Sequence, residues 1–250
     1  MTADWNASAY DRVANPQARW GAVVLDSLPL GGDETVLDAG CGTGRVTEML
    51  LERLPRGCVV ALDASGSMLA EARGRLARFG EQVEYVEADL ARPLPLSAKV
   101  DAILSTATFH WVLDHDALFA NLAAVLRPGG WLVAQCGGAG NVATLLETAL
   151  AVHPGFRREH RFETPEATRA RLETSGFVEI ETWLSDEPTR FDPGEPFESF
   201  LETVCLRTFL AELPPDERQP FVQAVAARMP EPVLDYVRLN IVARRGAEGG

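Results

Sequence analysis

A glycine-rich segment in this chain has the composition and setting of a nucleoside-binding turn. The segment, Asp38-Ala-Gly-Cys-Gly-Thr-Gly44, follows the apolar residues 35–37 and leads into a stretch whose apolar positions have helical spacing. Glycine lacks a Cβ, so Gly40, Gly42 and Gly44 permit positive φ values and let a ligand approach the backbone. The N–H groups of the following helix would face that ligand. The segment therefore predicts a strand, a ligand-binding turn and a helix start.

The spacing of the glycines distinguishes two classes of cofactor. Dinucleotide-binding folds use G-x-G-x-x-G, whereas this chain has G-x-G-x-G and carries Arg45 at the sixth position. Asp38 precedes the first glycine by two residues, and it either bonds backbone groups of the turn or contacts the amino group of a bound methionine. These features favour S-adenosylmethionine over NAD. A nucleotide-linked oxidoreductase, which would bind nicotinamide, is the alternative from another enzyme class.

Two more acidic residues follow the next two apolar runs and complete a nucleoside site. Asp63, at the end of the second strand, can accept hydrogen bonds from both hydroxyls of a ribose. Asp89 can accept from an adenine amino group while the N–H of Leu90 donates to the ring, and Met68 offers a polarizable surface for adenine. The expected cofactor site consists of Asp38, Gly40, Cys41, Gly42, Gly44, Asp63, Ala64, Met68, Asp89, Leu90, Ser105 and Tyr10.

Strand and helix patterns alternate along the chain from residue 35. Five β-α units in series imply an α/β fold with an open, doubly wound sheet and right-handed crossovers. The second strand is almost wholly apolar, as expected where helices cover both faces of a parallel sheet. Strands are expected at 35–39, 58–62, 83–88, 100–105, 131–136, 177–184 and 236–244, and helices at 18–28, 45–54, 67–79, 116–126, 142–152, 165–175, 196–213 and 215–229.

The helices between the last two strands are expected to form a lid. An insert at this place lies above the carboxyl edge of the sheet, where ligands bind in open α/β folds. We therefore predict one domain over residues 1–250, with an N-terminal cap segment at 1–30, a cofactor-binding core at 31–138, a substrate-side helical elaboration at 139–235 and a closing strand at 236–245.

Charge and composition exclude several kinds of partner. The net charge is -13 and no basic patch is segregated, so neither nucleic acid nor an anionic membrane surface is expected to bind. No segment approaches the roughly 20 apolar residues that cross a bilayer, and no secretion signal is visible. The cysteines have no metal-ligand spacing, which predicts reduced thiols, no metal and a cytoplasmic location. We expect a monomer or homodimer that acts on a small molecule.

The motifs resemble those of the class I S-adenosylmethionine-dependent methyltransferases, whose first motif is matched by Asp38 to Gly44, and the resemblance covers nearly the whole chain. It implies a Rossmann-like sheet of seven strands whose last strand is antiparallel, with a helical lid. Four segments resemble the trans-aconitate methyltransferase group more narrowly, which implies O-methylation of a carboxylate on a small metabolite. They are Trp5-Asn-Ala-Ser-Ala-Tyr10, Phe109-His-Trp-Val112, Leu126-Arg-Pro-Gly-Gly130 and Leu206-Arg-Thr-Phe-Leu210 through Ile241-Val-Ala-Arg-Arg245.

The role of His110 depends on the chemical class of the methyl acceptor. The methyl donor is already activated, so alignment for in-line attack supplies most of the rate, roughly 7 to 11 kcal/mol. A carboxylate is ionised at neutral pH and needs no base, so His110 would orient it. A hydroxyl or carbon acceptor would need proton removal, for which His110 is the best-placed base in this sequence. The product from the donor would be S-adenosylhomocysteine, and a third possibility is a protein that binds the donor without catalysis.

The acceptor is expected to be a small molecule that binds beneath the lid. Trans-aconitate enzymes commonly have Gln-Trp where this chain has a His-Trp pair. Lid arginines could bind an acidic substrate with two hydrogen bonds or pair with surface acids. The other histidines, His115, His153 and His160, are expected at the surface. The predicted acceptor residues are His110, Trp111, Tyr10 and Arg207.

Overall fold

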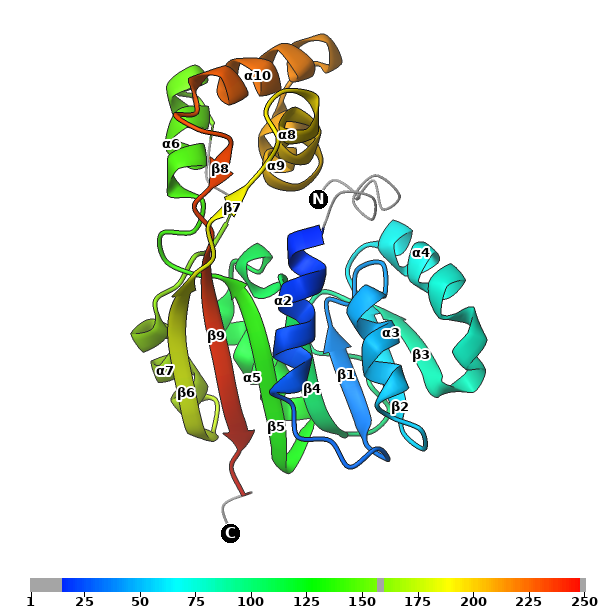
Figure 1. The fold of residues 1–250 in the computed structure, drawn as a ribbon. Coiled ribbons are helices and arrows are strands. Elements are labelled where there is room, and N and C mark those ends of the chain that lie inside the picture. The colour runs from blue at the N-terminus through cyan, green and yellow to red at the C-terminus, as the bar shows by residue number, and fades with distance from the viewer. Residues whose placement is uncertain (1–14, 157–159, 248–250) are drawn as a thin grey trace.

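The computed structural model describes residues 15–156 and 160–247 and is built on one large sheet. Its strands are β1 (Thr35–Ala39), β2 (Cys58–Asp63), β3 (Val83–Glu87), β4 (Val100–Thr106), β5 (Leu126–Gly137), β6 (Phe177–Asp186) and β9 (Val237–Arg245). They lie in the order β3-β2-β1-β4-β5-β9-β6 (Figure 1). β9 is antiparallel to both neighbours, whereas the other pairs are parallel. The predicted doubly wound sheet with a reversed last strand is confirmed.

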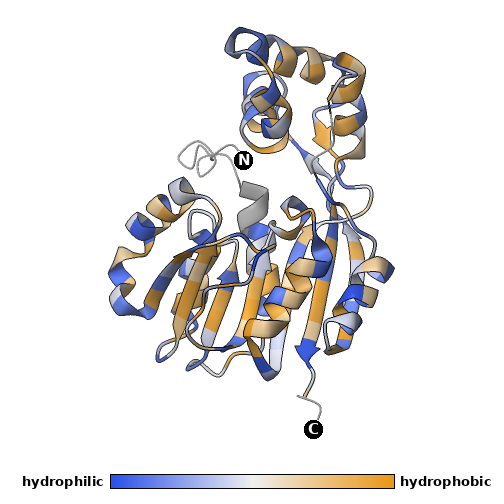
Figure 2. Ribbon diagram, turned by 180° about the vertical axis from the view of Figure 1, so that it is seen from behind, coloured by the Kyte–Doolittle hydropathy of each residue, from blue (hydrophilic) through white to orange (hydrophobic). Residues whose placement is uncertain are grey.

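Helices cover both faces of this sheet. They are α2 (Asn15–Asp26), α3 (Arg45–Glu52), α4 (Gly66–Leu76), α5 (His115–Val125) and α7 (Pro165–Thr174). Because side chains alternate along a strand, Val36 of β1 packs with the apolar residues of α2, α3 and α4, while Leu37 packs with those of α5 and α7. The apolar colouring of the strands in Figure 2 follows from this double burial.

A helical cap stands over the edge of the sheet where the parallel strands end (Figure 1). It comprises α6 (Ala143–Val152), α8 (Glu195–Phe200), α9 (Arg207–Glu212), α10 (Pro215–Arg228) and a ribbon of β7 (Thr189–Arg190) with β8 (Val233–Leu234). The helical cap has its own apolar core, in which the ring of Phe156 lies 5.0 Å from that of Phe209 and 5.2 Å from that of Phe221. Most of the helical cap comes from the insert between β6 and β9, above the carboxyl edge of the sheet.

Two elements differ most from the expected boundaries. The single helix expected at 196–213 is interrupted by a π-helical turn, Leu201–Cys205, in which the N–H of Leu206 donates to the carbonyl of Leu201 at 2.8 Å. β5 begins five residues earlier than expected, because the chain becomes extended directly after the end of α5. A register shift between β4 and β5 accommodates Pro128 within this strand. In the described parts of the chain, no helix has the length and apolarity to span a membrane.

Candidate active site

The glycine turn after β1 contains three glycines in three different surroundings. A Cβ on Gly40, which has φ 86°, would lie 2.2 Å from Oγ1 of Thr108, so this glycine lets Thr108 pack on the turn. A Cβ on Gly44, at φ 81°, would approach Cδ1 of Leu76 on α4 to 3.1 Å. At Gly42, with φ 54°, a Cβ would meet no atom within 4 Å. Of the three glycines predicted to clear space for a ligand, Gly42 alone faces open space.

The N–H groups of the turn are bonded within the protein. Those of Gly40 and Cys41 donate to the carbonyl of Leu62 at 2.8 and 2.9 Å. The N–H of Gly42 donates to Oδ2 of Asp63 at 2.9 Å. A dinucleotide is held through its pyrophosphate by free N–H groups at such a turn, and these three are already used. The geometry therefore favours a ligand that is not held here by phosphate, in agreement with the glycine spacing.

Asp63 connects the glycine turn to the start of α4. Its Oδ2 accepts from Gly42, and its Oδ1 accepts from the N–H of Ser65 at 2.9 Å. A carboxylate oxygen can accept more than one hydrogen bond, so a ribose hydroxyl can share this carboxylate with the backbone. Ala64 is exposed beside this carboxylate, and Met68 is buried in the first turn of α4, where its N–H donates to the N-cap Ser65. This arrangement fits the predicted ribose site.

Asp38 is a buried acid with one bonded and one unbonded oxygen. Its side chain is 1% exposed, and Oδ2 accepts from Oγ1 of Thr47 at 2.6 Å. Oδ1 has no hydrogen-bond partner among the described residues. Burial raises the pKa of Asp38 to about 7, against the opposing effect of Thr47, and the charge of Asp63 raises it further. A buried oxygen without a donor suits an ammonium group, so the structure fits the predicted contact with a methionine amino group.

The substitution Asp38→Asn is expected to stabilise the ligand-free protein at alkaline pH and to weaken cofactor binding. The folded pKa of about 7 exceeds the ordinary value of 3.8 for an aspartic acid. Wild-type stability attributable to this group therefore falls as pH rises from 3.8 to about 7 and is constant above that. Denaturant titrations should show the advantage of the variant growing across this window by up to roughly 4 kcal/mol, because a pKa difference of about 3 is worth about 1.4 kcal/mol for each unit. The same advantage at about pH 4 and about pH 9 would contradict the assignment.

Two residues predicted to bind adenine follow β3. Asp89 is exposed, and its Oδ1 accepts from the N–H of Ala91 at 2.9 Å, which shapes the turn. Leu90 is 4% exposed, and its carbonyl accepts from Nδ2 of Asn121 at 3.0 Å. Both residues lie at the carboxyl edge of the sheet, one strand beyond Asp63. Their contact with adenine remains a prediction.

Other predicted cofactor residues support the turn from beneath. Oγ of Ser105 is buried and donates to the carbonyl of Ala39 at 2.6 Å, so it ties the end of β4 to the end of β1. The side chain of Cys41 is buried in the apolar core under the turn, which leaves its backbone as the part that can meet a ligand. Tyr10 lies outside the described residues, as do all of residues 1–14 of the predicted N-terminal cap segment.

His110 lies in a short 3-10 helix, Phe109–Trp111, directly after β4. Its Nδ1 accepts a hydrogen bond from the N–H of Gly137 at 3.2 Å. Burial lowers the pKa of His110 well below its usual value, and the charge of Arg238 lowers it further. A neutral imidazole whose Nδ1 accepts carries its hydrogen on Nε2. His110 therefore presents a hydrogen-bond donor, Nε2–H, on the opposite edge of its ring.

A pocket of about 60 Å³ lies beside His110, between the sheet edge and the helical cap. Two of its residues, Ala107 and Val142, have φ values of 55° and 47°, which are rare for residues with a Cβ and concentrate at functional sites. The π-helical turn contributes Val204 and Cys205 to the lining. The pocket is lined by Ala107, His110, Trp111, Asn141, Val142, Leu146, His160, Phe162, Val204, Cys205, Tyr236 and Arg238.

The surface positions expected for His115 and His160 are wrong. His115 is 2% exposed, with its Nε2 2.9 Å from the carbonyl of Phe109, because α5 packs against the 3-10 helix. His160 lies in the pocket wall, with its ring centroid 4.5 Å from that of Trp111. His153 is exposed, as expected. A single histidine in a loop gives no periodic signal, so the sequence could not place His160.

Two predicted acceptor residues, Trp111 and Arg207, meet at this pocket. The guanidinium carbon of Arg207 lies 5.6 Å from the centre of a Trp111 ring, a cation–π arrangement. Arg207 is the first residue of α9, so it belongs to the helical cap and contacts Trp111 at the edge of the sheet. Burial lowers the pKa of His160 to about 4, and the charge of Arg207 adds to this effect. Sequence reasoning therefore chose residues that the structure does bring together with His110.

Arg238 is the main pocket residue that sequence reasoning missed. Its side chain is 3% exposed, its guanidinium carbon lies 4.6 Å from the centre of the Trp20 ring, and its Nε donates to Oε1 of Gln135 at 3.4 Å. Nε2 of Gln135 donates to Oδ1 of Asn240 at 2.7 Å, which fixes the orientation of the Gln135 amide. Arg238 and Asn240 are two polar residues on one face of an apolar strand. This pattern could have indicated from the sequence that the strand borders a polar site.

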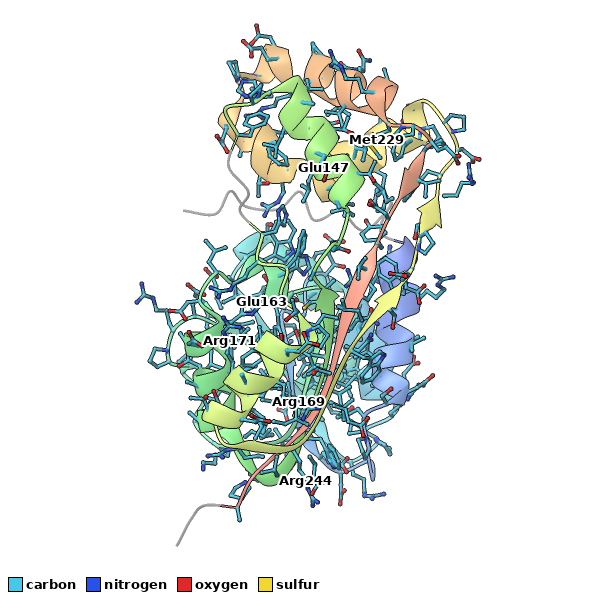
Figure 3. All side chains as sticks on the ribbon, turned by 90° about the vertical axis from the view of Figure 1, so that its left-hand side faces the viewer. Glu147, Glu163, Arg169, Arg171, Met229 and Arg244 are labelled. Carbon is cyan, nitrogen blue, oxygen red and sulfur yellow. The ribbon has the colours of Figure 1, made fainter. Side chains whose placement is uncertain are left out.

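An ion-pair network fastens the segment that carries His160. The N–H of Arg161 donates to the carbonyl of His110 at 2.9 Å, and its side chain pairs with Glu163. Arg171 of α7 approaches Glu163 to 3.4 Å, and Figure 3 shows these two side chains next to each other. Burial would raise the pKa of Glu163, but the two arginines outweigh it and hold the pKa below its usual value. The network therefore holds this wall of the pocket against the sheet.

The order of the strands and the reversed β9 define the fold of class I methyltransferases. Comparison of the sequence with known proteins gives the same class. The methyltransferase domain family matches residues 36–130. A trans-aconitate 2-methyltransferase of Methylobacterium nodulans is 30% identical over 97% of this chain and 99% of its own length. The chain therefore belongs to the S-adenosylmethionine-dependent methyltransferase family in which the trans-aconitate 2-methyltransferases are found.

Solved structures with lower identity show the same fold. Phosphoethanolamine N-methyltransferase 2 of Haemonchus contortus, in complex with phosphomonomethylethanolamine and S-adenosylhomocysteine, is similar with a TM-score of 0.65 at 19% identity. The match covers 97% of this chain and 57% of that one. The [4+2]-cyclase SpnF has a TM-score of 0.61 at 19% identity, over 92% of this chain and 82% of its own. Because the fold hosts a cyclase as well, the acceptor chemistry has to be argued from the site.

Proposed function

We propose that this methyltransferase transfers the methyl group of S-adenosylmethionine to a carboxylate oxygen of a small metabolite. The observation that carries the proposal is the hydrogen bond from Gly137 to Nδ1 of His110. It makes His110 a donor at Nε2, and a carboxylate is an acceptor that needs no base. The names of the curated relatives, which act on trans-aconitate, support a carboxylate acceptor as well.

Methylation of a hydroxyl or a carbon centre is the weaker alternative. It would require a group that removes a proton, and a base needs a free lone pair and a pKa near the working pH. The Nδ1 lone pair of His110 is occupied by Gly137, and burial makes the ring a poor proton acceptor. His160 has the same difficulty, because burial lowers its pKa to about 4. The pocket is therefore better suited to orienting an anion than to activating a neutral nucleophile.

The residues at the glycine turn fit S-adenosylmethionine. Gly42 leaves open space, the carboxylate of Asp63 lies at the turn where a ribose can share it, and the oxygen of Asp38 without a hydrogen-bond partner suits the amino group. Met68 and Leu90 are proposed to border the adenine. S-adenosylmethionine supplies a methyl group on a positive sulfur, so formation of the new C–O bond leaves the S–C electron pair on sulfur and requires no proton transfer. The chain itself contributes binding, alignment and exclusion of water.

Equilibrium titration tests the cofactor assignment. Saturable binding of S-adenosylmethionine and of S-adenosylhomocysteine is expected, with no binding of NAD, because the N–H groups of the turn are already bonded. Saturable NAD binding without S-adenosylmethionine binding would refute the assignment. Donor binding without methylation of any acid in a broad panel would favour a non-catalytic binding protein.

A further inference from the structure

Asn141 carries a buried amide in the lining of the pocket beside His110. The residue is 4% exposed, and its Oδ1 accepts a hydrogen bond from the N–H of Val237, the first residue of β9, at 3.0 Å. Only the oxygen of a side-chain amide can accept from an N–H group, because the nitrogen is a donor. The bond to Val237 therefore fixes the orientation of the amide and leaves the two hydrogens of Nδ2 on its other side.

The amide nitrogen of Asn141 is a donor that is not used within the described part of the chain. Oδ1 is the bonded atom of this amide there, and Nδ2 has no acceptor among the described residues. Nδ2 is also not one of the fully enclosed polar atoms that lack a partner, so it keeps contact with open space. The open space that Asn141 borders is the pocket. Because a shielded donor without an acceptor is unfavourable, Nδ2 is suited to an oxygen of a ligand.

The glycine that orients His110 also makes room for this amide. The N–H of Gly137 donates to Nδ1 of His110 at 3.2 Å. A Cβ on Gly137 would lie 2.8 Å from Nδ2 of Asn141 and 2.7 Å from Cε1 of Phe162, so any larger residue would displace both side chains. The amide of Asn141 therefore packs on the same end of β5 that holds the His110 ring.

The charges around the pocket favour an oxygen with negative charge. The charge of Arg238 acts on His110, and that of Arg207 acts on His160. No carboxylate belongs to the lining in the described ranges of the chain. A hydrogen bond from an amide to a carboxylate oxygen is charge-assisted and stronger than one to a neutral group.

The backbone around Asn141 is held by the sheet and by a second loop. The N–H of Asn141 donates to the carbonyl of Gly138 at 3.0 Å, and the N–H of Gly138 donates to the carbonyl of Val237 at 2.9 Å. The N–H of Val142, the residue with φ 47°, donates to the carbonyl of Asp235 at 3.0 Å. The direction of the Asn141 side chain is therefore fixed before a ligand binds, which reduces the entropy lost on binding.

We propose that Asn141 is an acceptor-binding residue, which donates a hydrogen bond from Nδ2 to an oxygen of the methyl acceptor. The bond from Val237 orients the amide, and Gly137 gives it room at the end of β5. The inference rests on the proposed function, because it requires the acceptor to bind in the pocket beside His110.

Two substitutions at Asn141 separate binding of the acceptor from support of Val237. Asn141→Ala removes both functions of the amide, whereas Asn141→Asp keeps an oxygen for the N–H of Val237 and removes the donor. They are compared with saturating S-adenosylmethionine and with the acid that gives the highest turnover in a panel that includes trans-aconitate. In Asn141→Ala, kcat/KM should fall roughly 10- to 150-fold, mostly through KM. Asn141→Asp should be no more active, because its carboxylate repels that of the acceptor.

A residue that only supports Val237 would give the reverse order. Recovery of kcat/KM in Asn141→Asp above the value for Asn141→Ala would overturn the inference, and so would wild-type kcat/KM in Asn141→Ala. Affinity for S-adenosylmethionine, measured by calorimetry, should stay unchanged in both variants. Should Asn141→Ala fail to fold, Asn141→Asp decides alone, because wild-type kcat/KM in that variant would exclude a donor role.

Gln82→Glu is the matched control for replacement of an amide by a carboxylate. Gln82 lies before β3, at the opposite edge of the sheet, where its Nε2 donates to the carbonyls of Leu54 and Gly57. This variant should lose stability and keep kcat/KM. An equal fall in kcat/KM would attribute the effect at Asn141 to destabilisation and overturn the inference. Methylation of no acid by the wild-type enzyme, despite donor binding, would overturn the proposed function itself and the inference with it.

Discussion

Valine at position 42 is expected to abolish methyl transfer by preventing cofactor binding. A Cβ on Gly42 enters open space at the centre of the proposed cofactor site, with Asp63 hydrogen-bonded to the same residue. The clash with the bound donor should weaken S-adenosylmethionine binding by roughly 100-fold or more, equivalent to about 3 kcal/mol. Calorimetric or fluorescence titration of the purified variant measures the effect directly. Affinity within a factor of about three of wild type would place the cofactor elsewhere.

Gly80 provides the control for backbone strain. It has the same φ of 54° and equally open surroundings, but it lies before β3, at the opposite edge of the sheet. A β-branched side chain is strained at positive φ, so both valine variants should lose stability. Only Gly42→Val should lose affinity for S-adenosylmethionine. Equal loss of binding in Gly80→Val would show that strain, rather than steric exclusion, explains the result.

Removal of the His110 ring is expected to weaken binding of the methyl acceptor much more than binding of S-adenosylmethionine. His110→Ala deletes the Nε2–H donor to the carboxylate, a charge-assisted bond worth roughly 1.5–3 kcal/mol, so kcat/KM should fall roughly 10- to 150-fold. Most of the loss should appear in KM, because the carboxylate is most negative before methylation. His110→Gln keeps an N–H donor and should recover part of the activity. Affinity for S-adenosylmethionine should stay unchanged in both variants.

The pH dependence separates an orienting His110 from a basic one. Burial and the charge of Arg238 hold the pKa of His110 well below 6.5, and a carboxylate acceptor is ionised above about pH 5. The wild-type kcat/KM should therefore show no step from His110 between about pH 6 and 8. A rising limb in that range that disappears in His110→Ala, together with no recovery in His110→Gln, would identify His110 as a general base.

The fold could be predicted because its signals are local. Apolar runs that end in glycine or aspartate mark the strands, and their alternation with amphipathic segments fixes the parallel order. The helical cap was less predictable in detail. Residues 201–205 read as ordinary helix, and the π-helical turn there depends on packing within the core of the helical cap rather than on local propensity. A break of that kind has no signature in a single sequence.

The two halves of the site also differ in how far local sequence signals predict them. The residues proposed to bind the donor could be grouped from the sequence because Asp38, Asp63 and the glycine turn lie at the ends of neighbouring strands, so the topology alone brings them together. The acceptor side is assembled from distant segments. Arg238 faces Gly137 only because β9 inserts antiparallel beside β5, and His160 reaches the pocket through the ion pairs of its loop. Sequence reasoning also missed that Gly40 and Gly44 serve packing, since close approach of another side chain is not encoded locally.

The fate of an isotopically labelled methyl group tests the central claim most directly. The enzyme is incubated with S-adenosylmethionine labelled in its methyl group and with a panel of carboxylic acids, and the products are identified by mass spectrometry before and after mild alkaline hydrolysis. Carboxylate methylation predicts labelled methyl esters that alkali cleaves to the free acid and labelled methanol. A label that survives alkali, on a hydroxyl oxygen, a carbon or a nitrogen, would contradict it.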